Sequence, residues 1–175
     1  MEQKPASLMK TSLTSGIYIG VVLILVSVVL YVTSLMFETW AQYVSWPILI
    51  GGAIYAQLSY RKSLGGEMTY GQALGAGVLA LVFASVLSAI YTILLYTVVD
   101  PGLTEQTRVV MEQRMVEQGR VPAEQMDQAL DMMMKFQKPP ILAGMAILGG
   151  AFVGLIISLI TGIFTKKNPS DVVPE

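Results

Sequence analysis

A chain of 175 residues that is 54% hydrophobic and only 13% charged does not have the composition of a typical soluble domain, and its net charge of -1 lacks the basic excess typical of nucleic-acid-binding proteins. Because the chain has no cysteine and no histidine, thiolate nucleophiles, histidine bases, disulfides and zinc sites with nitrogen or sulfur ligands are excluded. We therefore expect no catalytic residue, no cofactor, no metal ligand and no nucleic-acid partner, and a lipid bilayer around much of the chain.

Four stretches without a charged residue follow one another along the chain, at residues 11–37, 39–60, 68–99 and 139–165. Each is longer than the roughly 20 residues that cross the hydrocarbon layer as a helix. The backbone must form its hydrogen bonds internally in lipid, so these stretches are predicted to be helical. We expect four transmembrane helices at 15–37, 41–60, 71–99 and 141–164. The first exceeds the apolar length of a secretion signal and is expected to be retained.

Basic residues beside the ends of these helices indicate the orientation. Six of them fall on one side of the predicted topology: Lys4, Lys10, Arg61, Lys62, Lys166 and Lys167. The positive-inside rule then places both the tail 1–14 and the tail 166–175 in the cytoplasm, and residues 100–140 outside. Residues 100–140 also hold basic residues, so the assignment depends on the pairs Arg61-Lys62 and Lys166-Lys167, which adjoin helix ends.

The glycine-rich stretch GGEMTYGQALGAG, residues 65–77, matches neither a P-loop nor a dinucleotide-binding fingerprint. Gly65-Gly66 is predicted to form a turn with positive φ, and Thr69-x-x-Gln72 to form a capping box that starts the third helix. Ligand binding by this stretch is the less favoured alternative.

Small residues recur at helical spacing and favour close helix contacts, because lipid tails remove any hydrophobic preference for another helix. The predicted helix-packing residues are Gly16, Gly20, Gly71, Gly75, Gly77, Ala146, Gly150, Gly154, Ser158 and Gly162. We interpret them as the internal contacts of a four-helix bundle, and an interface between copies in a homo-oligomer is the alternative.

Residues 100–140 are expected to form an amphipathic helical hairpin between the third and fourth transmembrane helices. Asp100-Pro101 ends the third helix, Thr104 is the predicted cap of one short helix, and Pro122 begins a second. The candidates for a partner-binding face on the second helix are Met126, Leu130 and Met133. The two helices can pack on each other, lie on the membrane surface or bind a membrane protein partner.

Two weaker site hypotheses involve the same segment. Its methionines offer thioether ligands for Cu(I), and Glu124, Asp127 and Asp131 offer carboxylates for Ca²⁺. Core filling by methionine and a solvated acidic face, with Asp131 pairing with Lys135, are the favoured interpretations.

Several short motifs together resemble one family of membrane proteins. They are the Gly65-Gly66 turn, the TYGQA start of the third helix at 69–73, Asp100-Pro101, the Met- and Glu-rich segment, and a glycine-rich last helix ending in TKKNP at 165–169. The pattern resembles the small four-span bacterial membrane proteins catalogued as domain of unknown function 4199. This resemblance implies a multi-pass protein of the bacterial inner membrane and carries over no catalytic residue.

No ionisable residue lies well inside a predicted transmembrane helix, although transporters commonly place such residues there. The predicted function is therefore a non-enzymatic membrane scaffold or accessory subunit. A small transporter or channel subunit is the alternative. A lipid-modifying enzyme is the third class, for which the sequence offers no acid–base pair.

Overall fold

The computed structural model describes residues 7–119 and 121–167, and within them the chain has six α-helices and no β-strand. The α-helices are α1 (Leu8–Val32), α2 (Ser45–Ser63), α3 (Tyr70–Leu94), α4 (Leu103–Gln118), α5 (Met126–Phe136) and α6 (Pro139–Thr165). Three short elements connect them: η1 (Ala41–Tyr43), the π-helical turn η2 (Leu95–Val99) and η3 (Ala123–Gln125).

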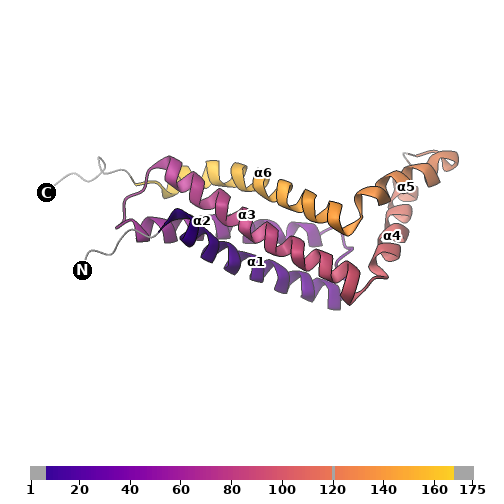
Figure 1. Cartoon of the computed structure of the whole chain (residues 1–175). Coiled ribbons are helices and arrows are strands. Elements are labelled where there is room, and N and C mark those ends of the chain that lie inside the picture. Colours follow the sequence, from indigo (N-terminus) through magenta and orange to yellow (C-terminus); the bar gives the residue numbers. More distant parts are fainter. Residues whose placement is uncertain (1–6, 120, 168–175) are drawn as a thin grey trace.

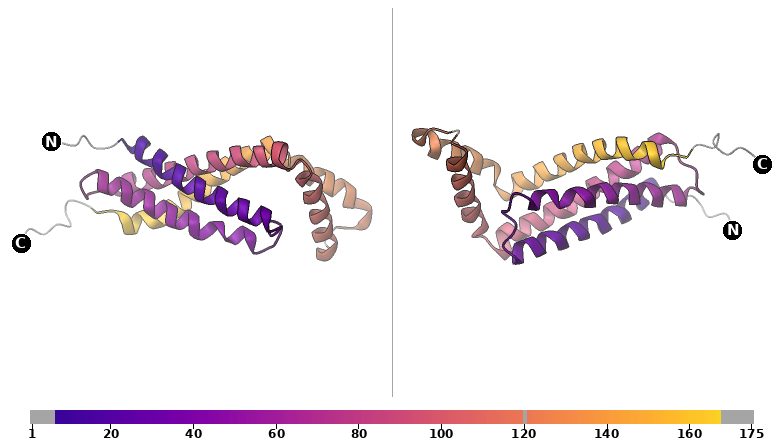
Figure 2. Two further views of the ribbon diagram at one scale, coloured as in Figure 1. Left: turned by 90° about the horizontal axis from the view of Figure 1, so that it is seen from below. Right: turned by 180° about the vertical axis from the view of Figure 1, so that it is seen from behind.

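The four long helices α1, α2, α3 and α6 run side by side (Figure 1). Helix α3 packs against the other three, and α2 also contacts α1 and α6. Helix α1 begins and α6 ends at one end of this array, which we call the terminal end. Helices α4 and α5 lie at the opposite, distal end, where α4 runs crosswise to the long helices (Figures 1 and 2).

In the part of the chain that the structure describes, three helical segments are long and apolar enough to cross a membrane: Leu8–Val32, Tyr70–Val99 and Pro139–Thr165. They are compatible with a multi-pass membrane protein. Helix α2 is not among them, because it starts only at Ser45 and its last turn carries Arg61 and Lys62. Residues 39–44 of the predicted apolar stretch therefore belong to the connection between α1 and α2 and not to the helix.

The first helix was expected at 15–37 but lies at Leu8–Val32. It stops early because Ser34, two residues after its end, has a positive φ of 57°, outside the right-handed helical region. The second helix was expected from residue 41, where the chain instead forms η1. Pro47 lies in the first turn of α2, where backbone N–H groups have no acceptor within the helix, so the missing N–H group of proline costs no helical hydrogen bond.

The predicted turn and capping box are both confirmed. Gly65 and Gly66 have φ values of 85° and 105°. The Gln72 N–H donates to the Thr69 hydroxyl at 3.4 Å, and the Thr69 N–H donates to the Gln72 side-chain oxygen at 2.9 Å. This stretch therefore starts α3 after a tight turn, as its residue types predicted.

The boundaries of the segment between α3 and α6 differ in detail from expectation. Helix α4 begins at Leu103 after Gly102, so Thr104 does not cap it. The Gly102 N–H instead donates to the Asp100 carboxylate at 3.0 Å. Pro139 and Pro140 were expected to precede the last helix but form its first two residues, because proline fits positions whose N–H groups have no helical partner. Lys4, Arg120 and most of the tail 166–175 lie outside the described residues.

Small side chains build the core of the array. Ala53, Ala80 and Ala84 have no exposed surface, and Leu81, Ile19 and Ile157 pack around them. Such residues allow two helix backbones to approach closely, which is how helices associate where hydrophobic burial provides no net driving force.

Candidate functional site

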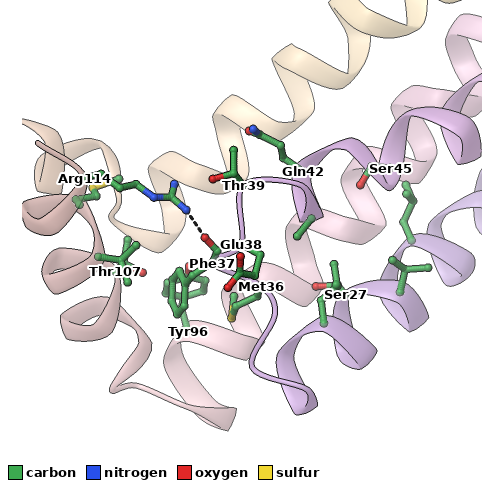
Figure 3. Close-up of a pocket in the computed structure, with 16 residues that line it drawn as sticks. Ser27, Met36, Phe37, Glu38, Thr39, Gln42, Ser45, Tyr96, Thr107 and Arg114 are labelled. Atoms are coloured by element: carbon green, nitrogen blue, oxygen red, sulfur yellow. Dashed lines mark hydrogen bonds between the residues drawn. The ribbon is translucent and has the colours of Figure 1, made fainter. Parts of the chain in front are cut away.

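A cavity of about 380 Å³ opens at the distal end, between α1, the α1–α2 loop, the start of α2, η2 and α4 (Figure 3). Its apolar wall includes Leu23, Val26 and Leu30. Its polar lining consists of Ser27, Glu38, Thr39, Gln42, Ser45, Tyr96, Thr107 and Arg114. The cavity lies within the size range of small-molecule sites and combines the apolar walls and few polar groups that such sites use.

Arg114 connects α4 to the α1–α2 loop across this cavity. Its guanidinium donates a hydrogen bond to the backbone carbonyl of Phe37 (Figure 3). A second contact joins the end of α1 to the turn before α4. The Tyr31 hydroxyl donates to the Asp100 carboxylate at 3.1 Å. The first contact holds α4 against the α1–α2 loop, and the second holds the turn before α4 against the end of α1.

A second chamber of about 240 Å³ continues from the cavity between α1, α2 and α3, and shares Leu23, Ser27 and Ser45 with it. Ser88, Tyr91 and Thr92 add three more hydroxyl groups. The Thr92 hydroxyl donates to the Ser88 carbonyl at 2.9 Å, whereas the buried Ser88 hydroxyl has no partner among the described residues. A hydroxyl-lined space of this size can hold water or a small polar ligand.

Close packing ends this chamber toward the terminal end. A Cβ atom at Gly20 would lie 2.9 Å from the Leu87 side chain, and one at Gly52 would lie 2.7 Å from Ile19. Ala84 has no exposed surface at the same level. The contacts of α1 with α2 and α3 therefore bound this chamber toward the terminal end.

Most of the small residues predicted to pack helices lie at helix contacts. Gly16 and Gly20 of α1 lie against α3. On α6, Gly150 lies against Ser85, Gly154 against Leu81 and Gly162 against Tyr70. Gly77 lies against the fully buried Ser158, and Gly75 makes an ordinary contact with Leu8. A Cβ atom added at Gly71 would meet nothing within 4 Å, and Ala146 is exposed, so neither packs a helix here.

A buried polar cluster at the terminal end was not predicted as a unit. The Thr165 hydroxyl donates to the Gln57 amide oxygen at 2.9 Å, and Arg61 donates to the Thr165 carbonyl at 3.0 Å. Gln57 has no exposed surface. Gln57 and Arg61 are four residues apart, which places them on one face of the helix. This spacing is the feature of the sequence from which the cluster could have been predicted.

The predicted partner face on α5 is only partly accessible. Leu130 is 1% exposed, Met126 is half-buried and Met133 is 47% exposed. Because α5 packs against α4, Leu130 stabilises this helix pair and is not available to a partner. The accessible apolar residues on α5 also include Met132 and Phe136, which the prediction omitted.

The acidic residues of α5 do not gather into a cluster. Asp131 lies 3.9 Å from Arg108 of α4, rather than pairing with Lys135 as expected from sequence. Among the described residues no three Asp or Glu side chains lie close enough to hold a metal ion. Both side chains of the Arg108–Asp131 pair are exposed, so the pair contributes little stability.

The comparison with protein families gives one match. The family described as "Protein of unknown function (DUF4199)" matches residues 14–167, which is most of the chain, and the chain belongs to this family. No curated protein and no solved structure matches it.

Proposed function

We propose that this member of the DUF4199 family is a four-span protein of the bacterial inner membrane that acts as a non-enzymatic scaffold or accessory subunit. Helices α1, α2, α3 and α6 would form a transmembrane four-helix bundle with both termini in the cytoplasm. Helix α2 would be the fourth span, with Arg61 and Lys62 at the cytoplasmic surface. Helices α4 and α5 would form the hairpin outside.

The observation that carries this proposal is the open face of α4. Leu103, Thr107 and Met115 are buried, and Thr107 and Arg114 also line the distal cavity. The opposite side of α4 presents four residues at i, i+4, i+7 and i+11: Glu105, Val109, Glu112 and Val116.

Val109 and Val116 are 54% and 63% exposed. A narrow apolar stripe between acidic residues suits a partner helix or strand with aliphatic and basic side chains. Because the buried residues of α4 and Arg114 lie on the other side of this helix, the Val109–Val116 face is directed away from the α1–α2 loop. It therefore offers an accessible surface for a protein outside the membrane.

Site-specific photocrosslinking in living cells tests the proposal. A photoreactive amino acid at Val109 or Val116 is expected to capture the same partner protein. The control position is Leu148 on α6, which is 74% exposed and should react with lipid alone. Absence of any protein adduct at both α4 positions would contradict the scaffold role. An adduct with a second copy of the chain would identify the partner as a homo-oligomer.

One observation favours the alternative of a small transporter or channel subunit. The hydroxyl-lined chamber of Ser88, Tyr91 and Thr92 reaches between α1, α2 and α3 from the distal end. A transporter would depend on this lining, whereas a scaffold would tolerate Ser88→Ala and Tyr91→Phe. Loss of the cellular phenotype in these variants, with normal protein levels and intact crosslinking at Val116, would favour the transporter.

A further inference from the structure

Helix α5 is amphipathic, but α4 covers only part of its apolar side. On the side that packs against α4, Leu130 is buried, with only 1% of its surface exposed, and Met134 is half-buried. Met132, Met133 and Phe136 are instead 59%, 47% and 55% exposed. At about 100° per residue these three lie on one face of the helix, away from α4. The uncovered face is thus a continuous apolar surface.

This uncovered face lies just before α6 in the chain. Only Gln137 and Lys138 separate the two helices. Ile141, Met145 and Leu148 recur along α6 at i, i+4 and i+7, and they are 41%, 54% and 74% exposed. Helix α6 is apolar enough to cross a membrane, so its exposed stripe faces lipid. The exposed apolar residues of α5 and those of α6 are therefore neighbours along the chain.

The acidic and the basic residues of this segment lie at different positions relative to the uncovered face. Asp127 and Asp131 lie on the side away from Met133, where Asp131 is near Arg108 of α4. Lys135 lies three residues after Met132, and Lys138 stands at the junction with α6; both are exposed. Lysine can lay its methylene chain along an apolar surface while its ammonium group contacts lipid phosphates.

We propose that α5 lies in the lipid–water interface of the leaflet at the distal end, with Met132, Met133 and Phe136 inserted among the lipids and Lys135 and Lys138 at the phosphates. The inference rests on the proposed four-span topology. Lipid is the occupant that fits, because only two residues separate this face from α6, whose exposed stripe faces lipid in the proposed topology, and because cations border it. Anchored in this way, α5 holds α4 with its Val109–Val116 face toward the solvent.

Depth-dependent fluorescence quenching tests this position. Because the chain has no cysteine, single variants can be labelled selectively. The full chain is placed in vesicles of phosphatidylcholine and phosphatidylglycerol, with an environment-sensitive fluorophore on Met132→Cys or, independently, Phe136→Cys. Lipids brominated near the headgroup end of the acyl chain should remove most of the emission at both positions, while aqueous iodide should quench it weakly. Asp127→Cys should show the reverse pattern, and Leu148→Cys serves as the membrane-embedded control.

Two results would overturn the inference. Iodide quenching at both Met132→Cys and Phe136→Cys as strong as at Asp127→Cys would place the face in water. Protection from both quenchers would show that a second copy of the chain covers it. If lipid brominated near the methyl end of the acyl chain fails to quench Leu148→Cys, the proposed membrane topology itself is wrong, and the inference about α5 is lost with it.

Discussion

The Thr165 hydroxyl at the end of α6 donates a 2.9 Å hydrogen bond to the side-chain oxygen of Gln57 on α2. Both residues are buried, with exposed fractions of 5% and 0%. The Gln57 amide group also reaches the Ser158 carbonyl at 3.5 Å. Gln57, one of the two glutamines within the long helices, thus connects α2 to α6 and has a structural role.

Removing this hydrogen bond should lower stability in detergent. Gln57→Leu and Thr165→Val are each expected to reduce the unfolding free energy, and the double variant should lose less than the sum of the two. Interhelical hydrogen bonds in membrane proteins are worth about 0.6 kcal/mol on average and up to about 1.7 kcal/mol. Unfolding in mixed micelles measures the coupling. Thr14→Val is the control, because that exposed hydroxyl donates within its own helix, to the Lys10 carbonyl. Strict additivity would show that the two side chains do not interact.

Two adjacent glycines on α6 provide a matched test of helix packing. A Cβ atom at Gly150 would lie 2.5 Å from the Ser85 Cβ atom, whereas one at Gly149 meets nothing within 4 Å. Gly150→Ala should therefore destabilise the protein by about 1–3 kcal/mol, as overpacked cores do. Gly149→Ala should leave stability unchanged or raise it by up to about 1 kcal/mol, because alanine favours the helix. Equal melting temperatures of the two variants in detergent would contradict the contact between α3 and α6 at Gly150.

Reporter fusions test the proposed orientation. Because Arg61-Lys62 and Lys166-Lys167 adjoin helix ends, reporters at Gly65 and after the last residue should be cytoplasmic. A reporter at Gly119, in the turn between α4 and α5, should be outside the membrane. Opposite sides for Gly65 and the C-terminus would show that α3 and α6 do not both span the membrane. A cytoplasmic reporter at Gly119 would reverse the position of the hairpin.

Arg114 should control how firmly α4 is held at the distal end. Arg114→Ala removes the guanidinium that donates to the Phe37 carbonyl. Amide hydrogen exchange is then expected to accelerate in α4 and in the loop between α1 and α2, because local opening governs such exchange. Arg108→Ala is the control, since its ion pair with Asp131 joins side chains that are 42% and 69% exposed. Equal acceleration in both variants would mean that Arg114 does not hold α4.

Local sequence patterns were sufficient for several parts of the fold. The lengths of apolar stretches predicted helices that the structure has at Leu8–Val32, Tyr70–Val99 and Pro139–Thr165. Gly65-Gly66 and Thr69-x-x-Gln72 predicted a turn and a cap, because these features depend on residues close together in the chain. The family resemblance was likewise carried by short motifs and is confirmed over residues 14–167.

Only the tertiary structure decided which residues meet across helices. Hydrophobicity indicates that Leu130 belongs to an apolar face, but not that α4 covers it while Met132 and Phe136 stay exposed. Helical spacing selected Gly150 and not Gly149 as a packing residue, but it did not indicate that Ser85 of α3 is the residue that Gly150 meets. The contacts Arg114–Phe37 and Gln57–Thr165 join residues 77 and 108 positions apart. Such contacts depend on the relative rotation and depth of whole helices, which local patterns do not specify.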